Sequence, residues 1–143
     1  PLMTRMMPGA MTFVQEMGEA FELVLLTNGF EKTQRTKILA CGLDSHIALM
    51  ITSESVGIAK PDKAIFDAAI SAATGKFGAF SHIFYAGDTW DTDVKGGVNA
   101  GIPTYWYNHA ALEVPVDEVS EHPLFMGSCE SLSELAGNLL ARV

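Results

Sequence analysis

The sequence is poor in cysteine and contains no long apolar run. Its 143 residues include two cysteines, Cys41 and Cys129. Two thiols this far apart are typical of a reduced protein rather than of a disulfide scaffold, so we expect both to be free and the protein to be cytoplasmic. The longest uncharged apolar stretch, around residues 46–51, falls far short of the roughly 20 residues that a membrane-spanning helix needs.

Basic residues are also scarce. The sequence has nine Lys and Arg residues and 17 Asp and Glu residues, which gives a formal net charge of −8. A chain of this charge repels phosphodiester backbones and anionic lipid surfaces, so we expect neither a nucleic acid polymer nor a membrane as a partner. Any phosphate that binds here must therefore be met locally, by a cationic side chain, a metal ion or backbone N–H groups.

What the sequence does contain is a regular alternation of short apolar runs and amphipathic stretches. The apolar runs 21–26, 46–51, 82–86 and 102–107 each end at polar residues or glycine. Because they are apolar on both faces, they are typical of parallel strands that are covered on both sides. Helices are expected at 11–18, 30–40, 64–73, 91–100 and 132–140, with Gly42 and Gly101 as helix stops and Ser131 as an N-cap.

An alternation of strands and helices predicts an open α/β sheet with right-handed crossovers. In such sheets the ligand site lies in the loops that follow the carboxyl ends of the strands. Two of these loops are Thr27-Asn28-Gly29 and Lys60-Pro61-Asp62. The first can bind an anionic oxygen through a hydroxyl and backbone N–H groups, and the second holds a lysine outside the next helix as a charge for phosphate. Taken singly, each is more typical of an ordinary turn before a helix.

A third loop, residues 87–93, holds three carboxylates, Asp88, Asp91 and Asp93. An acidic first helical turn explains Asp91 and in part Asp93, because carboxylates favour the positive end of the helix dipole. It does not explain Asp88, which directly ends the strand. Carboxylate oxygens are ligands that Mg²⁺ prefers. Together, the three loops predict a site that binds a phosphate beside a magnesium ion.

Three stretches at these loops carry a family resemblance. LLTNG at 25–29, KPDKAIFDAA at 60–69 and GDTWDTDVKGGVNAGIPTYW at 87–106 resemble the second, third and fourth motifs of the haloacid dehalogenase (HAD) superfamily. The resemblance spans roughly residues 8 to 140. Within the superfamily, ITSESVGIAKPDKAIFDAA is most similar to the pyrimidine 5′-nucleotidase branch.

The resemblance implies a Rossmann-like core and hydrolysis of a phosphomonoester through an aspartyl-phosphate. It implies that Thr27 and the backbone N–H of Asn28 bind the phosphoryl group, and that Lys60 neutralises its charge. It further implies that Asp88 is a direct Mg²⁺ ligand and that Asp93 holds a metal-bound water or the lysine. No family role falls on the third carboxylate of the acidic loop.

The first motif of the family, Asp-x-Asp-x-Thr/Val at the end of an apolar strand, is absent from this sequence. That motif supplies the nucleophile, so we expect the nucleophile to lie upstream of Pro1. We then expect residues 1–8 to be a remnant of a cap or linker, and 9–143 to be a partial core without its central N-terminal strand and most of its cap.

The missing strand would lie between the Thr27 strand and the Asp88 strand. Adjacent strands are about 4.8 Å apart, so the two remaining halves cannot pair across an empty position. The two unpaired edges are templates for a further strand. We therefore expect a missing N-terminal segment or a second chain to complete the sheet, and the 143 residues alone to be inactive or to fold poorly.

The expected function is that of the C-terminal part of a Mg²⁺-dependent phosphomonoester hydrolase acting on a small phosphorylated metabolite, with a nucleoside 5′-monophosphate as the candidate. The alternative is a catalytically inactive phosphate-binding or interaction module. A metal-independent dehalogenase fits less well because of Gly87-Asp88. A dinucleotide-binding loop is disfavoured because the glycines of 96–101 end a helix instead of opening one. The sequence assigns no role to the histidines, and it favours packing roles for Trp106 and Tyr107.

Overall fold

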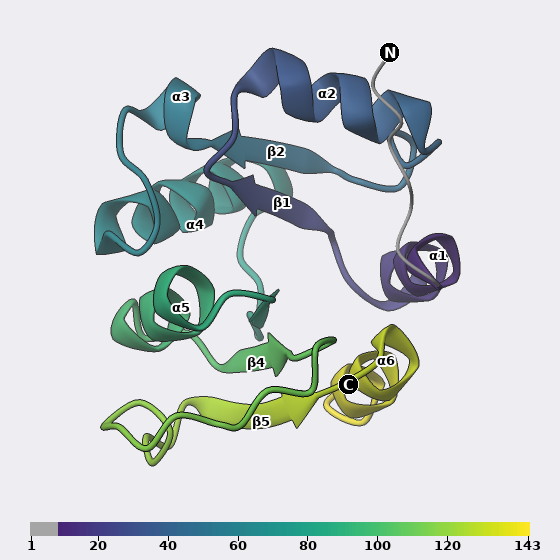
Figure 1. The fold of residues 1–143 in the computed structure, drawn as a ribbon. Helices are drawn as coiled ribbons and strands as arrows, with labels where there is room; N and C mark the ends of the chain where they lie inside the picture. Colours follow the sequence, from purple (N-terminus) through teal and green to yellow (C-terminus); the bar gives the residue numbers. More distant parts are fainter. Residues whose placement is uncertain (1–8) are drawn as a thin grey trace.

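The computed structural model describes residues 9–143, so the expected cap or linker remnant at 1–8 lies outside the described residues. Helices and strands alternate along most of the chain (Figure 1). In chain order they are α1 (Ala10–Ala20), β1 (Val24–Thr27), α2 (Glu31–Ala40), β2 (Leu49–Thr52), α3 (Ser53–Val56), α4 (Lys63–Phe77), β3 (Tyr85–Gly87), the π-helical turn η1 (Trp90–Val94), α5 (Lys95–Asn99), β4 (Thr104–Tyr107), β5 (Phe125–Cys129) and α6 (Leu132–Leu140).

All strand pairs are parallel, as the apolar runs predicted, but the strands form two separate sheets. β1 pairs with β2, from Val24 opposite Leu49 to Thr27 opposite Thr52. β3 pairs with β4 and β4 with β5, which gives the order β3-β4-β5. Within residues 9–143, no strand pairs with the second edge of β1 or of β3. The expected parallel α/β fold is therefore confirmed, with its sheet in two parts.

Most predicted helices agree with the structure. α6 covers the residues expected, and Ser131 caps it by accepting a hydrogen bond from the backbone N–H of Glu134 at 3.1 Å. α4 extends beyond the expected range to Phe77 and is capped by Asp62, whose side chain accepts from the N–H of Ala64. Both expected stops, Gly42 and Gly101, have the positive φ that glycine adopts without strain.

Several expectations about local structure are wrong. Residues 91–100 are not one helix, because the N–H groups of Asp93 and Val94 both donate to the carbonyl of Thr89 and widen the first turn. All four expected strands start later than predicted, at Val24, Leu49, Tyr85 and Thr104. The strand β5 was not predicted, because its small residues Gly127 and Ser128 break up the apolar pattern.

The buried side chains form three clusters. In the first, Met17 of α1 packs with α6 and with Tyr105 and Cys129 of β4 and β5. The second lies around η1, α5 and Trp106. The third consists of Ile51, Ile65, Phe66 and Ile102, and it joins β2 and α4 to the start of β4. Both cysteines are free thiols, as expected. Among the described residues, no helix is long and apolar enough to cross a membrane.

Candidate functional site

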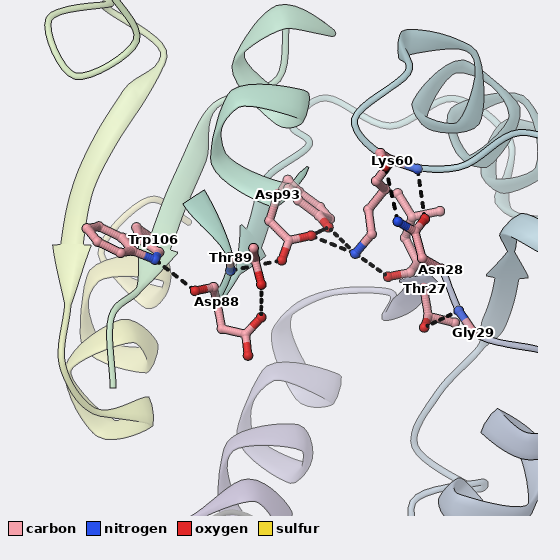
Figure 2. A network of polar contacts seen from close by, with 10 residues as sticks. Thr27, Asn28, Gly29, Lys60, Asp88, Thr89, Asp93 and Trp106 are labelled. Atoms are coloured by element: carbon pink, nitrogen blue, oxygen red, sulfur yellow. Dashed lines mark hydrogen bonds and ion pairs between the residues drawn. The ribbon is translucent and has the colours of Figure 1, made fainter. Parts of the chain in front are cut away.

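Lys60 lies at the centre of the polar network shown in Figure 2. Its ammonium donates to Oδ1 of Asp93 at 2.6 Å, to the hydroxyl of Tyr85 at 3.2 Å and to the carbonyl of Leu26 at 3.3 Å. The Lys60 side chain is 11% exposed and that of Asp93 is 6% exposed. The loop before α4 thus carries a largely buried positive charge across to the acidic loop after β3.

Asp93 is held from three sides. Besides the ammonium, it accepts from the Tyr85 hydroxyl at 2.6 Å and from the N–H of Thr89 at 3.1 Å. A Cβ atom on Gly87 would lie 2.3 Å from Cγ of Asp93. Only glycine at position 87 therefore lets the carboxylate approach this closely. Three donors, one of them charged, thus satisfy the buried carboxylate.

The β1 loop brings Thr27 and Asn28 to the same network. The Thr27 hydroxyl oxygen accepts from the N–H of Gly29 at 3.1 Å, and no group within 9–143 accepts its proton, so the hydroxyl can still donate to a bound oxygen. The side-chain amide of Asn28 makes two hydrogen bonds to the backbone of Lys60, accepting from its N–H at 2.7 Å and donating to its carbonyl at 3.1 Å. This pair fixes the loop that carries the lysine.

Asp88 is the exposed carboxylate of the site. Its side chain is 52% exposed and accepts from the Thr89 hydroxyl at 3.1 Å. The indole of Trp106 donates to the backbone carbonyl of Asp88 at 3.0 Å, and Nε2 of His109 lies 3.8 Å from the Asp88 carboxylate.

Asp91 differs from both other carboxylates of the loop, because its side chain is 82% exposed and pairs with Lys95. Asp91 thus lies on the helix surface, as its first-turn position predicted.

The network borders a cavity of about 280 Å³ between the two sheets. The unpaired edge of β1 contributes Leu26, and that of β3 contributes Tyr85, Ala86 and Gly87. The remaining lining residues are Phe13, Lys60, Asp88, Asp93, Tyr107, Leu132 and Leu135. The lining of the cavity is therefore mostly apolar, with three charged side chains, those of Lys60, Asp88 and Asp93.

The described residues offer a magnesium ion one well-placed ligand. Asp88 presents a half-exposed carboxylate at this cavity, and no three His, Cys, Asp or Glu side chains gather into a metal-binding group anywhere in 9–143. Mg²⁺ is commonly bound through one or two carboxylates, with substrate phosphate and water completing its six ligands. The donor set fits Mg²⁺ as a partial site, and the further ligands would have to come from outside the described residues.

The structure brings the sequence-predicted residues to one end of the two sheets. In Figure 2, Lys60 and Asp93 lie between Thr27 and Asn28 on one side and Asp88 on the other. No sequence pattern indicated a role for the hydroxyl of Tyr85, the indole hydrogen bond of Trp106 or the position of His109. Tyr85 lies within an apolar strand, Trp106 was expected to be a packing residue, and a lone histidine after a strand has no recognisable spacing.

Comparisons with known proteins place the chain in a family. The haloacid dehalogenase-like hydrolase family matches residues 2–101. Pyrimidine 5′-nucleotidase YjjG of Escherichia coli K12 is 36% identical over 109 residues, which cover 76% of this chain and 48% of YjjG. The chain thus spans about half the length of this curated relative.

Two solved structures share the fold. A magnesium-bound crystal structure of the HAD-hydrolase YfnB from Bacillus subtilis superposes with a TM-score of 0.80 at 27% identity, covering 95% of this chain and 57% of that one. A 2-haloacid dehalogenase from Pseudomonas syringae gives a TM-score of 0.76 at 26% identity, covering 96% and 54%. The resemblance in the three motifs is confirmed by the sequence and structural matches together: the chain belongs to the haloacid dehalogenase-like hydrolase family.

Proposed function

We propose that this chain is the C-terminal part of a Mg²⁺-dependent phosphomonoester hydrolase that acts on a small phosphorylated metabolite. The observation that carries the proposal is the Lys60 ammonium, held 2.6 Å from Asp93 at a cavity that Asp88 also lines. The match to a pyrimidine 5′-nucleotidase supports a nucleoside 5′-monophosphate as the first substrate class to test.

Each residue of the network has a task in binding and transferring a phosphoryl group. The Thr27 hydroxyl and the N–H of Asn28 bind phosphoryl oxygens, and Lys60 neutralises negative charge as it moves between the attacking and leaving oxygens. Asp93 holds Lys60 in place, and Asn28 fixes the backbone that carries it. A magnesium ion on Asp88 would add a second positive charge on the phosphoryl group.

The cavity between β1 and β3 suggests where the rest of the enzyme binds. Both edges that border it are unpaired, and both belong to parallel sheets, so one extended apolar segment parallel to them would pair with each. We propose that such a segment, from the N-terminal side of the chain or from a second chain, completes the sheet and supplies the carboxylate nucleophile beside these charged side chains. Residues 9–143 are then the partial core, and 1–8 belong to the cap or linker.

The hydrolase proposal is tested with protein produced from the complete gene. We expect it to hydrolyse p-nitrophenyl phosphate and nucleoside 5′-monophosphates in the presence of Mg²⁺, and to lose this activity with EDTA. No turnover of any phosphomonoester, together with release of chloride from 2-chloropropionate, would replace the phosphatase proposal with a dehalogenase.

The sheet-completion proposal is tested with residues 1–143 alone. We expect a broad or irreversible thermal transition by circular dichroism and no hydrolysis, because the one strand that would pair with both β1 and β3 is missing. A sharp, reversible transition of the 143-residue chain would show that the two sheets need no added strand.

One observation favours a second candidate, the inactive phosphate-binding module. All three N–H groups of Lys60 already donate to the chain's own oxygens. A site closed in this way would bind phosphate weakly and catalyse nothing. Isothermal titration with inorganic phosphate, run beside the hydrolysis assay, separates binding without turnover from the enzymatic function.

A further inference from the structure

The hydroxyl of Tyr85 has a place in the network that packing does not explain. The ring itself is fixed by an edge-to-face contact with Phe66, with centroids 5.1 Å apart, and by close approach to Gly97, where a Cβ would lie 2.9 Å from the ring. The hydroxyl lies beyond these contacts, 2.6 Å from Oδ1 of Asp93 and 3.2 Å from the ammonium of Lys60. A phenylalanine side chain would make the same packing contacts and would lack only the hydroxyl group.

The direction of each hydrogen bond follows from the groups present. The ammonium and the neutral hydroxyl both have protons to give, whereas an ionised carboxylate can only accept. Burial, followed by the charge of Asp93, raises the pKa of Tyr85 far above its ordinary value of 10.0, so the phenol stays protonated. The hydroxyl therefore donates its one hydrogen bond to Asp93, and its oxygen accepts a hydrogen bond from Lys60.

Tyr85 and Lys60 thus share one carboxylate oxygen. Oδ1 of Asp93 accepts a hydrogen bond from each of them, and Oδ2 accepts one from the N–H of Thr89. At 2.6 Å the ammonium cannot come closer to Oδ1, so the hydroxyl acts on its orientation. Without the hydroxyl, the N–H group that now donates to Tyr85 has no acceptor among the described residues and is free to turn. With the hydroxyl present, this N–H group is held on a neutral oxygen, and a phosphoryl oxygen can replace that acceptor more readily than it could replace a carboxylate.

We propose that Tyr85 is a positioning residue for the Lys60 ammonium: its hydroxyl accepts one ammonium N–H, shares Oδ1 of Asp93 and so fixes the orientation of the ammonium at the cavity. This inference rests on the proposed phosphoryl site. It predicts that removal of the hydroxyl weakens charge stabilisation in the transition state more than it weakens substrate binding, because an ammonium whose orientation is no longer fixed has to be ordered as charge develops.

The experiment compares Tyr85→Phe with Tyr105→Phe in protein from the complete gene. Tyr105 is a buried tyrosine of β4 whose hydroxyl accepts from Nε of Arg142 at 3.2 Å, so it controls for the loss of one buried phenol hydroxyl outside the network. For p-nitrophenyl phosphate, we expect Tyr85→Phe to lower kcat by about tenfold or more, as loss of a hydrogen bond to a charged group does, with KM nearly unchanged. Tyr105→Phe should leave kcat within about twofold of the parent protein.

A second readout does not depend on activity. In ¹H–¹⁵N spectra of the lysine ammonium groups, we expect a slowly exchanging Lys60 signal in the parent protein and in Tyr105→Phe, and a shifted or faster-exchanging one in Tyr85→Phe. If no phosphomonoester is hydrolysed, the proposed function fails while this signal still tests Tyr85. An unchanged Lys60 signal with unchanged kcat in Tyr85→Phe would overturn the inference, as would equal loss of kcat in both variants.

Stability gives the same test if Tyr85→Phe is too unstable for spectra at room temperature. A double-mutant cycle of Tyr85→Phe with Lys60→Met, followed by urea unfolding, measures the coupling between the hydroxyl and the ammonium. We expect the two changes to be non-additive, as contacting residues are. Strict additivity would show that the hydroxyl does not act on Lys60.

Discussion

β4, the central strand of the three-stranded sheet, and β1, a strand of the two-stranded sheet, differ in how completely they are buried. Thr104, Tyr105 and Trp106 of β4 are buried, whereas all residues of β1 are partly exposed. The helices differ in the same way, because α6 buries three residues and α2, which lies over β1 and β2 in Figure 1, buries none. A strand of a parallel sheet is normally covered on both faces and paired on both edges. Among residues 9–143, β1 is paired on one edge alone, with β2.

The difference shows which contacts hold the candidate site together. Isolated two-stranded sheets are marginal in water, so β1–β2 depends on what joins it to the larger sheet. Two connections do this in the described chain: the apolar cluster around Phe66 and the bonds of Lys60 to Leu26, Tyr85 and Asp93. The lysine and its loop thus belong to one sheet and the carboxylates to the other. The site is formed where the two meet.

The largest expected effect lies on the carboxylate side. Asp88→Asn should lower Mg²⁺-dependent hydrolysis of p-nitrophenyl phosphate by at least about a thousandfold, because the one exposed ligand of the metal loses its charge. Asp91→Asn is the matched control from the same loop, and its rate should stay within about twofold. Equal damage from the two changes would mean that the metal ligand in this loop has been assigned to the wrong carboxylate.

The apolar connection between the sheets is tested with Phe66→Ala. Phe66 is 1% exposed and contacts Tyr85, so its truncation should lower the free energy of unfolding by about 3–5 kcal/mol. Hydrogen exchange should then accelerate more in β1 and β2 than in β4. Leu135→Ala, a change in the cluster around α6, should give the opposite order. The same order in both variants would mean that the two sheets unfold as one unit.

The ionic connection is tested with Lys60→Met. We expect kcat to fall by about a hundredfold or more through the loss of positive charge at the phosphoryl group. The free energy of unfolding should fall by about 3 kcal/mol, because Asp93 stays buried without its cation. Adding Asp93→Asn should restore much of the stability and none of the activity. Lys63→Met, which removes an exposed lysine paired with Asp67, is the control and should change neither.

A smaller effect is expected from Asn28→Ala. The change removes both hydrogen bonds to the Lys60 backbone but leaves the backbone N–H of residue 28 in place. These bonds are exposed, so we expect a loss of about 1 kcal/mol in the free energy of unfolding, measured in urea. The activity should fall about fivefold to tenfold as the lysine loop loosens. Asn99→Ala at the end of α5 is the control. Wild-type activity in Asn28→Ala would show that the position of Lys60 does not depend on the hydrogen bonds from Asn28.

The smallest effect concerns Asp117, in the loop between β4 and β5. A hydrogen bond from the Trp90 indole lowers the pKa of Asp117 below its ordinary value of 3.8, with backbone N–H groups of the same loop and Lys95 adding to the shift. A folded-state pKa below the unfolded value stabilises the fold above pH 3.8, and this contribution is lost as the pH falls through the lower value. Trp90→Phe should move the pKa of Asp117 upward in a ¹³C titration and leave hydrolysis at neutral pH nearly unchanged. An unchanged pKa of Asp117 in Trp90→Phe would show that the indole hydrogen bond does not cause the lowered pKa.

Much of this arrangement could be predicted from the sequence, because it follows from local patterns. Short apolar runs that end in polar residues gave the strands and their direction, and the carboxyl-end rule placed Thr27, Lys60 and Asp88 at one end. The missing first motif led us to expect two separated sheets. The orientation of side chains across the cavity could not be predicted. That Tyr85 turns its hydroxyl to Asp93 depends on Phe66 and Gly97, which the fold alone brings beside it.

The convergence of the two sheets on one phosphoryl group is tested most directly by a crystal structure of the protein from the complete gene, grown with Mg²⁺ and tungstate. We predict tungstate within hydrogen-bonding distance of the Thr27 hydroxyl and the Lys60 ammonium, with the metal on Asp88. Tungstate bound away from these residues, or Lys60 and Thr27 on opposite sides of a closed cavity, would contradict the account.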